Sequence, residues 1–321
     1  MPKTYTQDQL VPAEKPTFYF VGVTTGKSSI RRVFPAWAKE LQLGDVEMVG
    51  IDLTLHAPRE HYRRVVSFLK DDPLSLGALV TTHKIDLFRE AHDLFDEVGP
   101  LAELMGEVSC LAKHDGKFVA TAKDPYSSGL ALDAFIPAGY FEDTGAPVFI
   151  MGAGGSAIAI DWHLSRPERG ADIPSRVIVA NRSSGRLDAL RAIHGQAGNV
   201  TELETIHTPD PTDSDAIVAE LAPGAIVINA TGLGKDAPGS PLTNAAVFPE
   251  RARVWDLNYR GDLLFLDQAR AQQAERDLHV EDGWVYFIHG WTQVIKDVFE
   301  IGIPTSGPGF DRLADIARDV R

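Results

Sequence analysis

A glycine-rich segment in the middle of the chain has the residue types and spacing of a nucleotide-binding turn. Gly152, Gly154 and Ala157 follow the G-x-G-x-x-A spacing, between an apolar strand pattern and a helix pattern. The first glycine permits a tight turn, the second lets the backbone approach a pyrophosphate, and the small third residue lets the helix pack on the strand. The alternative is a purely structural turn. The contacts expected at a dinucleotide are Gly152, Ala153, Gly154, Gly155, Ser156 and Ala157.

The segment after the next predicted strand favours one kind of dinucleotide. An NAD site usually has an Asp or Glu at this strand end, which binds the ribose 2′-hydroxyl. Here the strand VIVA is followed by NRSSGR (181–186), which contains two arginines, two serines and no acid. Guanidinium groups suit a 2′-phosphate, so the segment favours NADP, unless the arginines are only solvated charges. The expected contacts are Asn181, Arg182, Ser183 and Arg186, with Thr231 and Gly232 from the later segment VINATGLG.

A lysine stands at the end of a short β-rich run in the first third of the chain. Lys84 follows LVTTH (79–83), and an amphipathic helix pattern begins after it. Such a lysine is either an ordinary exposed charge or a positioned catalytic group. The residues around it do not decide between the two.

Strand and helix patterns alternate along the chain, which predicts an α/β protein with mostly parallel sheets. The first strands expected are 18–23, 46–53 and 76–82, followed by a hairpin at Asp115-Gly116. A helix pattern over 125–136 precedes the glycine turn, and two more buried strands are expected within 225–234 and 253–259. A domain boundary is expected between residues 125 and 145.

The composition is that of a globular protein with room for two cores. The chain has 321 residues, 44% of them hydrophobic, and no apolar run of 18 residues, so we expect no membrane span. The polar leader MPKTYTQDQLVPAEKP lacks the apolar stretch of a secretory signal. A net charge of −14 disfavours nucleic acid as a partner. The single cysteine, Cys110, fits a reducing cytoplasm and a position in the core.

Five segments, in their order and spacing, resemble those of the shikimate and quinate dehydrogenases: GAGGSA, NRSSGR, INATG, VWDLNY and DGWVYFIHGWTQVI. The resemblance covers nearly the whole chain. It implies a substrate domain over 1–125, which the last helices (289–321) can complete, a Rossmann-like NADP domain over 126–288, and an active site in the cleft between them. It also implies an NADP(H)-dependent oxidoreductase that interconverts a secondary alcohol and a ketone on a small hydroxylated molecule. We expect a cytoplasmic enzyme, and a homodimer is compatible with the sequence.

The resemblance also gives Lys84 a role and a partner. Lys84 matches the lysine of the family pattern N-V-T-x-P-x-K, and Asp124 matches the aspartate of N-T-D. In the family the two act together on the hydroxyl that is oxidised. Moving a hydride off a carbinol carbon requires the hydroxyl proton to leave. A lysine held near a carboxylate can exchange that proton and stabilise the developing alkoxide, so we expect Lys84 and Asp124 to be catalytic.

Positions at which the family holds shikimate's carboxylate and hydroxyls carry other residues here. The replacements are Ala78, Val80, Ser109, Ala122 and Gly290. Each buried polar contact is worth about 1 kcal/mol or more, so we expect weak binding of shikimate itself and a more apolar pocket at 78, 80 and 122.

Other polar residues are available to hold a substrate. The two serines of the family's S-x-S motif fall on Thr24 and Gly26 or, after a small shift, on Ser28 and Ser29. The glutamine of the closing helix falls on Gly290, with Gln293 one turn later. The substrate contacts expected are Ser28, Ser29, Thr82, Ser109, Tyr259 and Gln293.

Two other functions stay open at this stage. One is an enzyme like methylenetetrahydrofolate dehydrogenase, which also has a lysine after a first-domain strand. The other is a non-catalytic NADP-binding sensor, against which the presence of both Lys84 and Asp124 argues. The histidines His56, His61 and His92 show no metal-ligand spacing, so we expect no metal site.

Overall fold

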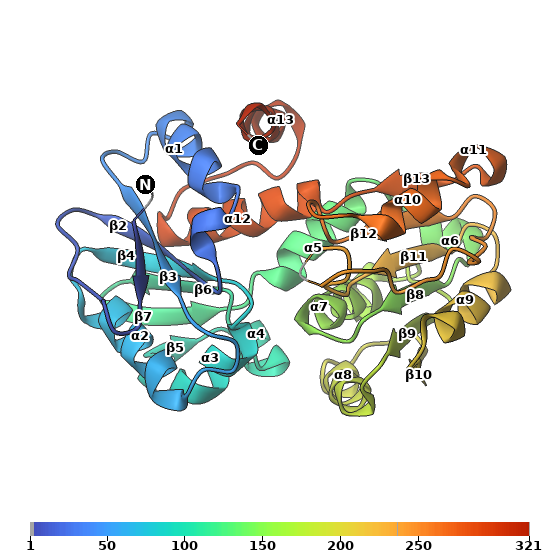
Figure 1. Ribbon diagram of the computed structural model, residues 1–321, viewed down its shortest axis with the longest axis horizontal. Helices are drawn as coiled ribbons and strands as arrows, with labels where there is room; N and C mark the ends of the chain where they lie inside the picture. Colours follow the sequence, from blue (N-terminus) through green and yellow to red (C-terminus); the bar gives the residue numbers. More distant parts are fainter. Residues whose placement is uncertain (1–2, 236, 321) are drawn as a thin grey trace. The chain divides into compact units, whose positions relative to one another are not determined.

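The computed structural model describes residues 3–235 and 237–320 and divides into two compact units (Figure 1). Residues up to Lys123 and from Ile288 onward form the first unit, and Asp124–Phe287 form the second. Each unit contains one β-sheet, and most strand pairs are parallel, which confirms the expected α/β class. Over the described residues, the helices are too short or too polar to cross a membrane.

The first unit is built on a seven-stranded sheet in the order β1-β3-β2-β4-β6-β7-β5. β6 runs antiparallel to both of its neighbours, and the other pairs are parallel. The turn between β6 and β7 is the predicted one, with φ angles of 50° at Asp115 and 76° at Gly116. The strands are β1 (Thr4–Thr6), β2 (Thr17–Gly22), β3 (Glu47–Asp52), β4 (Ser75–Val80), β5 (Glu97–Val98), β6 (Cys110–His114) and β7 (Lys117–Thr121).

Helices cover both faces of this sheet, because the side chains of β2 alternate between two cores. Tyr19 and Val21 belong to the core shared with α2 (Arg59–Asp71) and α3 (Lys84–Ala91). Phe18 and Phe20 point the other way, and their rings lie 6.2 and 4.8 Å from that of Trp291 in α12 (Trp284–Val298).

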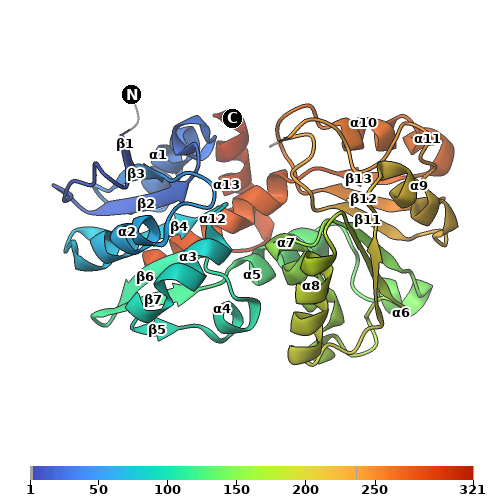
Figure 2. The same cartoon turned by 60° about the horizontal axis from the view of Figure 1, so that its bottom comes forward.

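Two further helices lie on that second face, where α1 (Ile30–Glu40) packs beside α13 (Gly307–Asp319) (Figure 2). The indole N–H of Trp37 in α1 donates to the Leu313 carbonyl of α13 at 2.9 Å. The last helix of the chain is thereby held to the first unit by a buried hydrogen bond. A short helix, α4 (Pro100–Met105), completes this unit.

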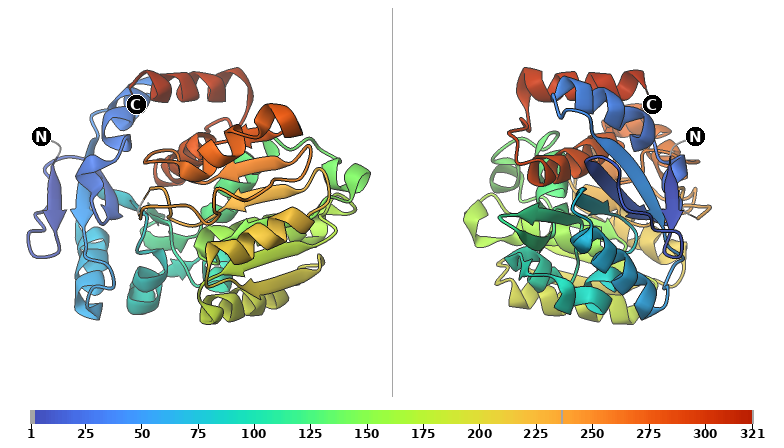
Figure 3. Two further views of the ribbon diagram at one scale, coloured as in Figure 1. Left: turned by 45° about the vertical axis from the view of Figure 1, so that its right-hand side comes forward. Right: turned by 90° about the vertical axis from the view of Figure 1, so that its left-hand side faces the viewer.

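The second unit is a parallel six-stranded sheet in the order β10-β9-β8-β11-β12-β13 (Figure 3). Counted from β8, this is the 3-2-1-4-5-6 order of doubly wound dinucleotide-binding domains. In such sheets ligands bind at the carboxyl ends of the strands where the strand order reverses, which is here between β8 and β11. The strands are β8 (Val148–Met151), β9 (Val177–Asn181), β10 (Leu203–His207), β11 (Ile226–Asn229), β12 (Arg253–Asp256) and β13 (His279–Glu281).

Helices cross between these strands. Those of the second unit are α5 (Asp124–Asp133), α6 (Tyr140–Thr144), α7 (Gly155–Ser165), α8 (Ser184–Gln196), α9 (Pro211–Glu220), α10 (Leu264–Arg270) and α11 (Gln273–Arg276), before α12 begins at Trp284.

The structure differs from the sequence prediction at short segments on sheet edges. The polar leader, which precedes the first predicted strand, contains β1, which pairs in parallel with β3. The edge strands β10 and β13 were not predicted, because they are only partly buried and show weak alternation. Between α3 and α4 the chain forms the short strand β5, and Gly99 is extended before Pro100 starts α4.

Candidate functional site

The glycine turn lies between β8 and α7, at the point where the strand order of the second sheet reverses. Gly152 has a φ of +105°, and a Cβ there would lie 2.8 Å from the carbonyl oxygen of Ala230, which follows β11. This position therefore requires glycine. Gly154 has a φ of −89°, and its Cβ would meet nothing within 4 Å. Open space beside the N-terminus of α7 is what close approach of a diphosphate requires, so the turn fits a dinucleotide.

A buried carboxylate of the second unit is linked to this turn through a tyrosine. Asp124 is the first residue of α5 and is 5% exposed. The Tyr286 hydroxyl of α12 donates to Asp124 Oδ2 at 3.3 Å and lies 3.2 Å from the Oγ of Ser156, the second residue of α7. Ser127 and Ser128, within α5, donate to the Asp124 carbonyl at 3.3 and 2.6 Å. The start of α5 and the glycine turn are thus connected through side chains.

The loop after β9 presents two exposed arginines. Arg182 and Arg186 lie at the end of β9 and in the first turn of α8, and both are exposed. The Asn181 side chain donates to the Ser183 carbonyl at 3.1 Å, and a ring nitrogen of His207 lies 3.0 Å from the Arg182 carbonyl. The backbone of the loop is therefore held while its two guanidinium groups stay accessible to an anion.

Three buried polar residues that we did not single out in the sequence hold the loop after β11. Asp256 Oδ1 accepts from the Asn229 side chain at 3.1 Å and from the Asn258 N–H at 2.9 Å. Asn229 Oδ1 accepts from the N–H and the hydroxyl of Thr231 at 3.0 and 2.6 Å, and Asn258 donates to the Leu233 carbonyl at 2.9 Å. Burial raises the pKa of Asp256 to about 7. Polar residues that end otherwise apolar strands were the signal that could have found this network.

Lys84 is the first residue of α3 in the first unit and is half-buried. Its N–H donates to the Thr81 carbonyl at 3.0 Å. The preceding residue, His83, is 1% exposed and lies 3.1 Å from the Leu53 carbonyl and 3.3 Å from the Tyr62 hydroxyl. Burial lowers the pKa of His83. His83 is therefore a structural residue that fixes the turn on which Lys84 stands.

Ser109, expected to contact substrate, holds the backbone before Asp124. It is 3% exposed, and its Oγ accepts from the Lys123 N–H at 2.6 Å. The Lys123 ammonium pairs with Asp297 of α12 at 2.8 Å, and the Cys110 thiol lies 3.5 Å from the same carboxylate. Burial raises the pKa of the Cys110 thiol, which agrees with the expected core position.

The other residues expected to contact substrate lie in different parts of the chain. Ser28 and Ser29 are half-buried just before α1, Thr82 is exposed before α3, and Gln293 is half-buried in α12. Tyr259 belongs to the second unit, where its ring lies 4.6 Å from that of Phe287.

Three of the replaced positions are core residues. Ala78, Val80 and Ala122 are buried in the cluster beneath α2 and α3, so they do not form an exposed apolar wall. Their side chains pack inside this core. As for metals, no group of three or more His, Cys, Asp or Glu in residues 3–235 and 237–320 is arranged to hold an ion.

The strand order and the glycine turn define the chain as a two-domain α/β protein with a Rossmann-like dinucleotide-binding fold in its second unit. No family model matches the chain. It is 28% identical over 183 residues to the NADP(+) shikimate dehydrogenase of Lactococcus lactis subsp. cremoris, a match that covers 57% of this chain and 60% of that relative. It is also 28% identical over 220 residues to the shikimate dehydrogenase (NADP(+)) of Sphingopyxis alaskensis, covering 67% of this chain and 70% of that relative.

A solved structure shares the fold over almost its whole length. Quinate dehydrogenase from Corynebacterium glutamicum, determined in complex with NAD, matches with a TM-score of 0.72 and 19% identity, over 95% of this chain and 99% of that chain. In sequence the chain is similar to NADP(+) shikimate dehydrogenases, and in fold it is similar to a quinate dehydrogenase, which confirms the resemblance seen in its motifs.

Proposed function

We propose that this protein is an NADP(H)-dependent dehydrogenase that interconverts a secondary alcohol and a ketone on a small hydroxylated, carboxylated molecule of the shikimate or quinate type. The observation that carries the proposal is the link between the glycine turn and a buried carboxylate. Ser156, Tyr286 and Asp124 are joined by contacts of 3.2 and 3.3 Å. A carboxylate tied to a dinucleotide turn suits a reaction in which the cofactor takes a hydride while the protein takes a proton. The activity named for the sequence relatives supports the same reaction class.

The proposed cofactor is NADP. The backbone around Gly152 and Gly154, with the N-terminus of α7, binds the diphosphate. Arg182 and Arg186 bind the 2′-phosphate through charge-assisted hydrogen bonds. The bound nicotinamide supplies the hydride transfer.

The arginine assignment is tested by measuring the affinities for NADPH and NADH in the double variant Arg182→Ala/Arg186→Ala. We expect NADPH affinity to fall at least about tenfold while NADH affinity changes little, because only NADPH carries the phosphate that the guanidinium groups bind. Arg191→Ala is the matched control, since Arg191 pairs with Asp188 on the same helix. An equal loss for both cofactors would contradict the assignment.

The proton step is assigned to Lys84 and Asp124. In the direction of oxidation, they accept the hydroxyl proton as the hydride leaves the carbinol carbon, and they return it to the carbonyl oxygen in reduction. Lys84→Met should reduce kcat by about 100-fold or more and leave NADPH affinity within about twofold, because general acid–base groups contribute this much to rate and little to cofactor binding. Lys39→Met, at an exposed lysine of α1, is the control. Turnover near that of the unmodified protein would remove Lys84 from the catalytic machinery.

The substrate class is tested by following absorbance of the reduced nicotinamide across a panel of hydroxy acids and polyols that includes shikimate and quinate. We expect turnover of at least one carboxylated polyol. Turnover of a methylenetetrahydrofolate substrate alone would favour the folate enzyme, and measurable NADP binding without any turnover would favour a sensor.

The proposal includes a homodimer that acts in the cytoplasm. A buried single cysteine and a net charge of −14 are compatible with a reducing compartment. Light scattering should give twice the chain mass of 35.0 kDa. A monomeric mass at micromolar concentration would contradict the dimer.

A further inference from the structure

Tyr286 stands between the carboxylate and the glycine turn, although the three residues are far apart in the sequence. Its hydroxyl donates to Asp124 Oδ2 at 3.3 Å, across 162 residues of chain, and lies 3.2 Å from Ser156 Oγ, across 130 residues. The ring is half-buried and meets the ring of Trp255 edge-on at 5.9 Å, so its direction is set by packing. All four residues lie in the second unit.

The directions of the two hydrogen bonds in this group of side chains are linked. The Tyr286 hydroxyl has a single hydrogen, which it donates to Asp124 Oδ2. The oxygen of Tyr286 then accepts the hydrogen bond that Ser156 donates with its single hydroxyl hydrogen. A diphosphate bound at the start of α7 competes for that hydrogen, because Ser156 is the second residue of the helix and phosphate oxygens are strong acceptors.

We propose that Tyr286 is a positioning residue that holds the carboxylate of Asp124 and relays cofactor occupancy at Ser156 to it. The inference rests on the proposed function for its catalytic meaning. When the diphosphate takes the hydrogen of Ser156, Tyr286 loses its contact with Ser156 and keeps its bond to Asp124. The side chain that handles the proton is thereby coupled to the presence of the group that handles the hydride. The link runs through two hydroxyl groups, those of Ser156 and Tyr286.

The first test is kinetic and compares two tyrosine-to-phenylalanine variants. Tyr286→Phe removes the hydroxyl and should lower kcat about tenfold, with the KM for substrate and the affinity for NADPH within about twofold, because a hydrogen bond to a carboxylate orients it without binding either ligand. The control is Tyr140→Phe, which removes a buried bond of 2.6 Å to the Gly224 carbonyl in the same unit. It should lower thermal stability and leave kcat unchanged. An unchanged kcat in Tyr286→Phe would overturn the positioning role.

The second test does not need turnover. The chain contains 7 tyrosines, so ¹⁹F NMR of protein labelled with 3-fluorotyrosine gives few resonances, and the one missing in Tyr286→Phe identifies Tyr286. We expect Asp124→Asn and Ser156→Ala each to shift this resonance, and NADP⁺ to shift it in the unmodified protein but much less in Ser156→Ala. An unshifted resonance in Asp124→Asn, or an equal response to NADP⁺ in Ser156→Ala, would overturn the relay.

The two proposals fail in different ways. If the protein binds NADP⁺ and turns over no hydroxylated substrate, the proposed function is wrong, while the NMR response still decides whether the relay exists. If turnover occurs and the Tyr286 resonance ignores Ser156 and Asp124, only the relay is wrong.

Discussion

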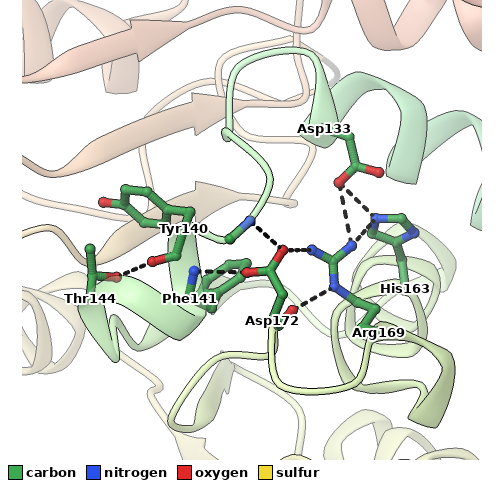
Figure 4. A network of polar contacts seen from close by, with 8 residues as sticks. Asp133, Tyr140, Phe141, Thr144, His163, Arg169 and Asp172 are labelled. Carbon is green, nitrogen blue, oxygen red and sulfur yellow. Dashed lines mark hydrogen bonds and ion pairs between the residues drawn. The ribbon is translucent and has the colours of Figure 1, made fainter.

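The packing of α5 on α7 leads to a quantitative prediction for Gly129→Ala. A Cβ at Gly129 would lie 2.3 Å from Nδ1 of His163, 2.6 Å from Cε1 and 2.9 Å from Cγ. His163 is 5% exposed, and its other nitrogen lies 3.1 Å from Asp133 and 3.1 Å from Arg169 (Figure 4). Arg169 is in turn held by Asp172, so the imidazole has no direction in which to retreat without breaking this network.

The expected loss of stability is the sum of two unfavourable effects, reduced by the higher helix propensity of alanine. Overpacking of a filled site costs about 1–3 kcal/mol. Loss of a hydrogen bond to a charged partner costs about 1.5–3 kcal/mol more. Alanine recovers about 1 kcal/mol relative to glycine in a helix. We therefore expect the free energy of unfolding of the second unit to fall by about 3 kcal/mol, which lowers Tm by roughly 6–12 °C for a domain of this size.

The assay is thermal and urea unfolding of the full chain, followed by circular dichroism. Gly195→Ala is the matched control, because Gly195 is an exposed glycine of α8 whose Cβ would meet nothing within 4 Å. Its Tm should stay the same or rise. The double variant Gly129→Ala/His163→Ala should be no less stable than His163→Ala alone, since the clash is gone. A Tm of Gly129→Ala equal to that of the unmodified protein would refute the reasoning.

Three further predictions concern the second unit. Burial raises the pKa of Asp256 to about 7, above its ordinary value. In the folded protein Asp256 therefore holds a proton that it loses near pH 4 in the unfolded chain. The free energy of unfolding should fall by up to about 1.4 kcal/mol for each pH unit between about pH 4 and pH 7. Asp256→Asn should flatten that slope in urea unfolding. Burial lowers the pKa of His194, but its hydrogen bond to Asp161 at 2.8 Å, the attraction of the Asp161 charge and the contact with the Thr201 carbonyl together raise it overall. The stabilisation present below about pH 6.5 should therefore fade at higher pH and be absent in Asp161→Asn. Gly152→Ala should weaken NADPH binding more than tenfold in a fluorescence titration, because its Cβ would press on the Ala230 carbonyl at 2.8 Å, and unchanged binding would contradict the need for glycine there.

Much of the fold could be predicted because its signals are local. The glycine turn, the hairpin at Asp115-Gly116 and the strands with continuous apolar runs depend on residues adjacent in the chain, and the structure has them at nearly the predicted positions. The edge strands β1, β10 and β13 could not be predicted in this way. Their strand geometry comes from pairing with β3, β9 and β12, and edge residues need not be apolar.

The candidate site residues show the same difference between local and long-range signals. The turn at Gly152 and the arginines after β9 follow from spacing within one strand–turn–helix unit, so they were found in the sequence. Residue type alone does not reveal the role of Ser109, which was expected to contact substrate, because its buried Oγ accepts from the Lys123 N–H. Burial and partners are properties of the folded chain, and a single sequence does not state them.

The sequence by itself determined the class of the protein and the place of its dinucleotide turn, because backbone conformation at glycine and the periodicity of apolar residues act over a few positions. Only the tertiary structure decided which side chains meet at that turn. Asp124 and Tyr286 are separated by 162 residues, and their hydroxyl–carboxylate contact exists because the second sheet brings the starts of α5, α7 and α12 together. A contact between residues so far apart in the sequence leaves no local sequence pattern, because it depends on how distant helices and strands pack together.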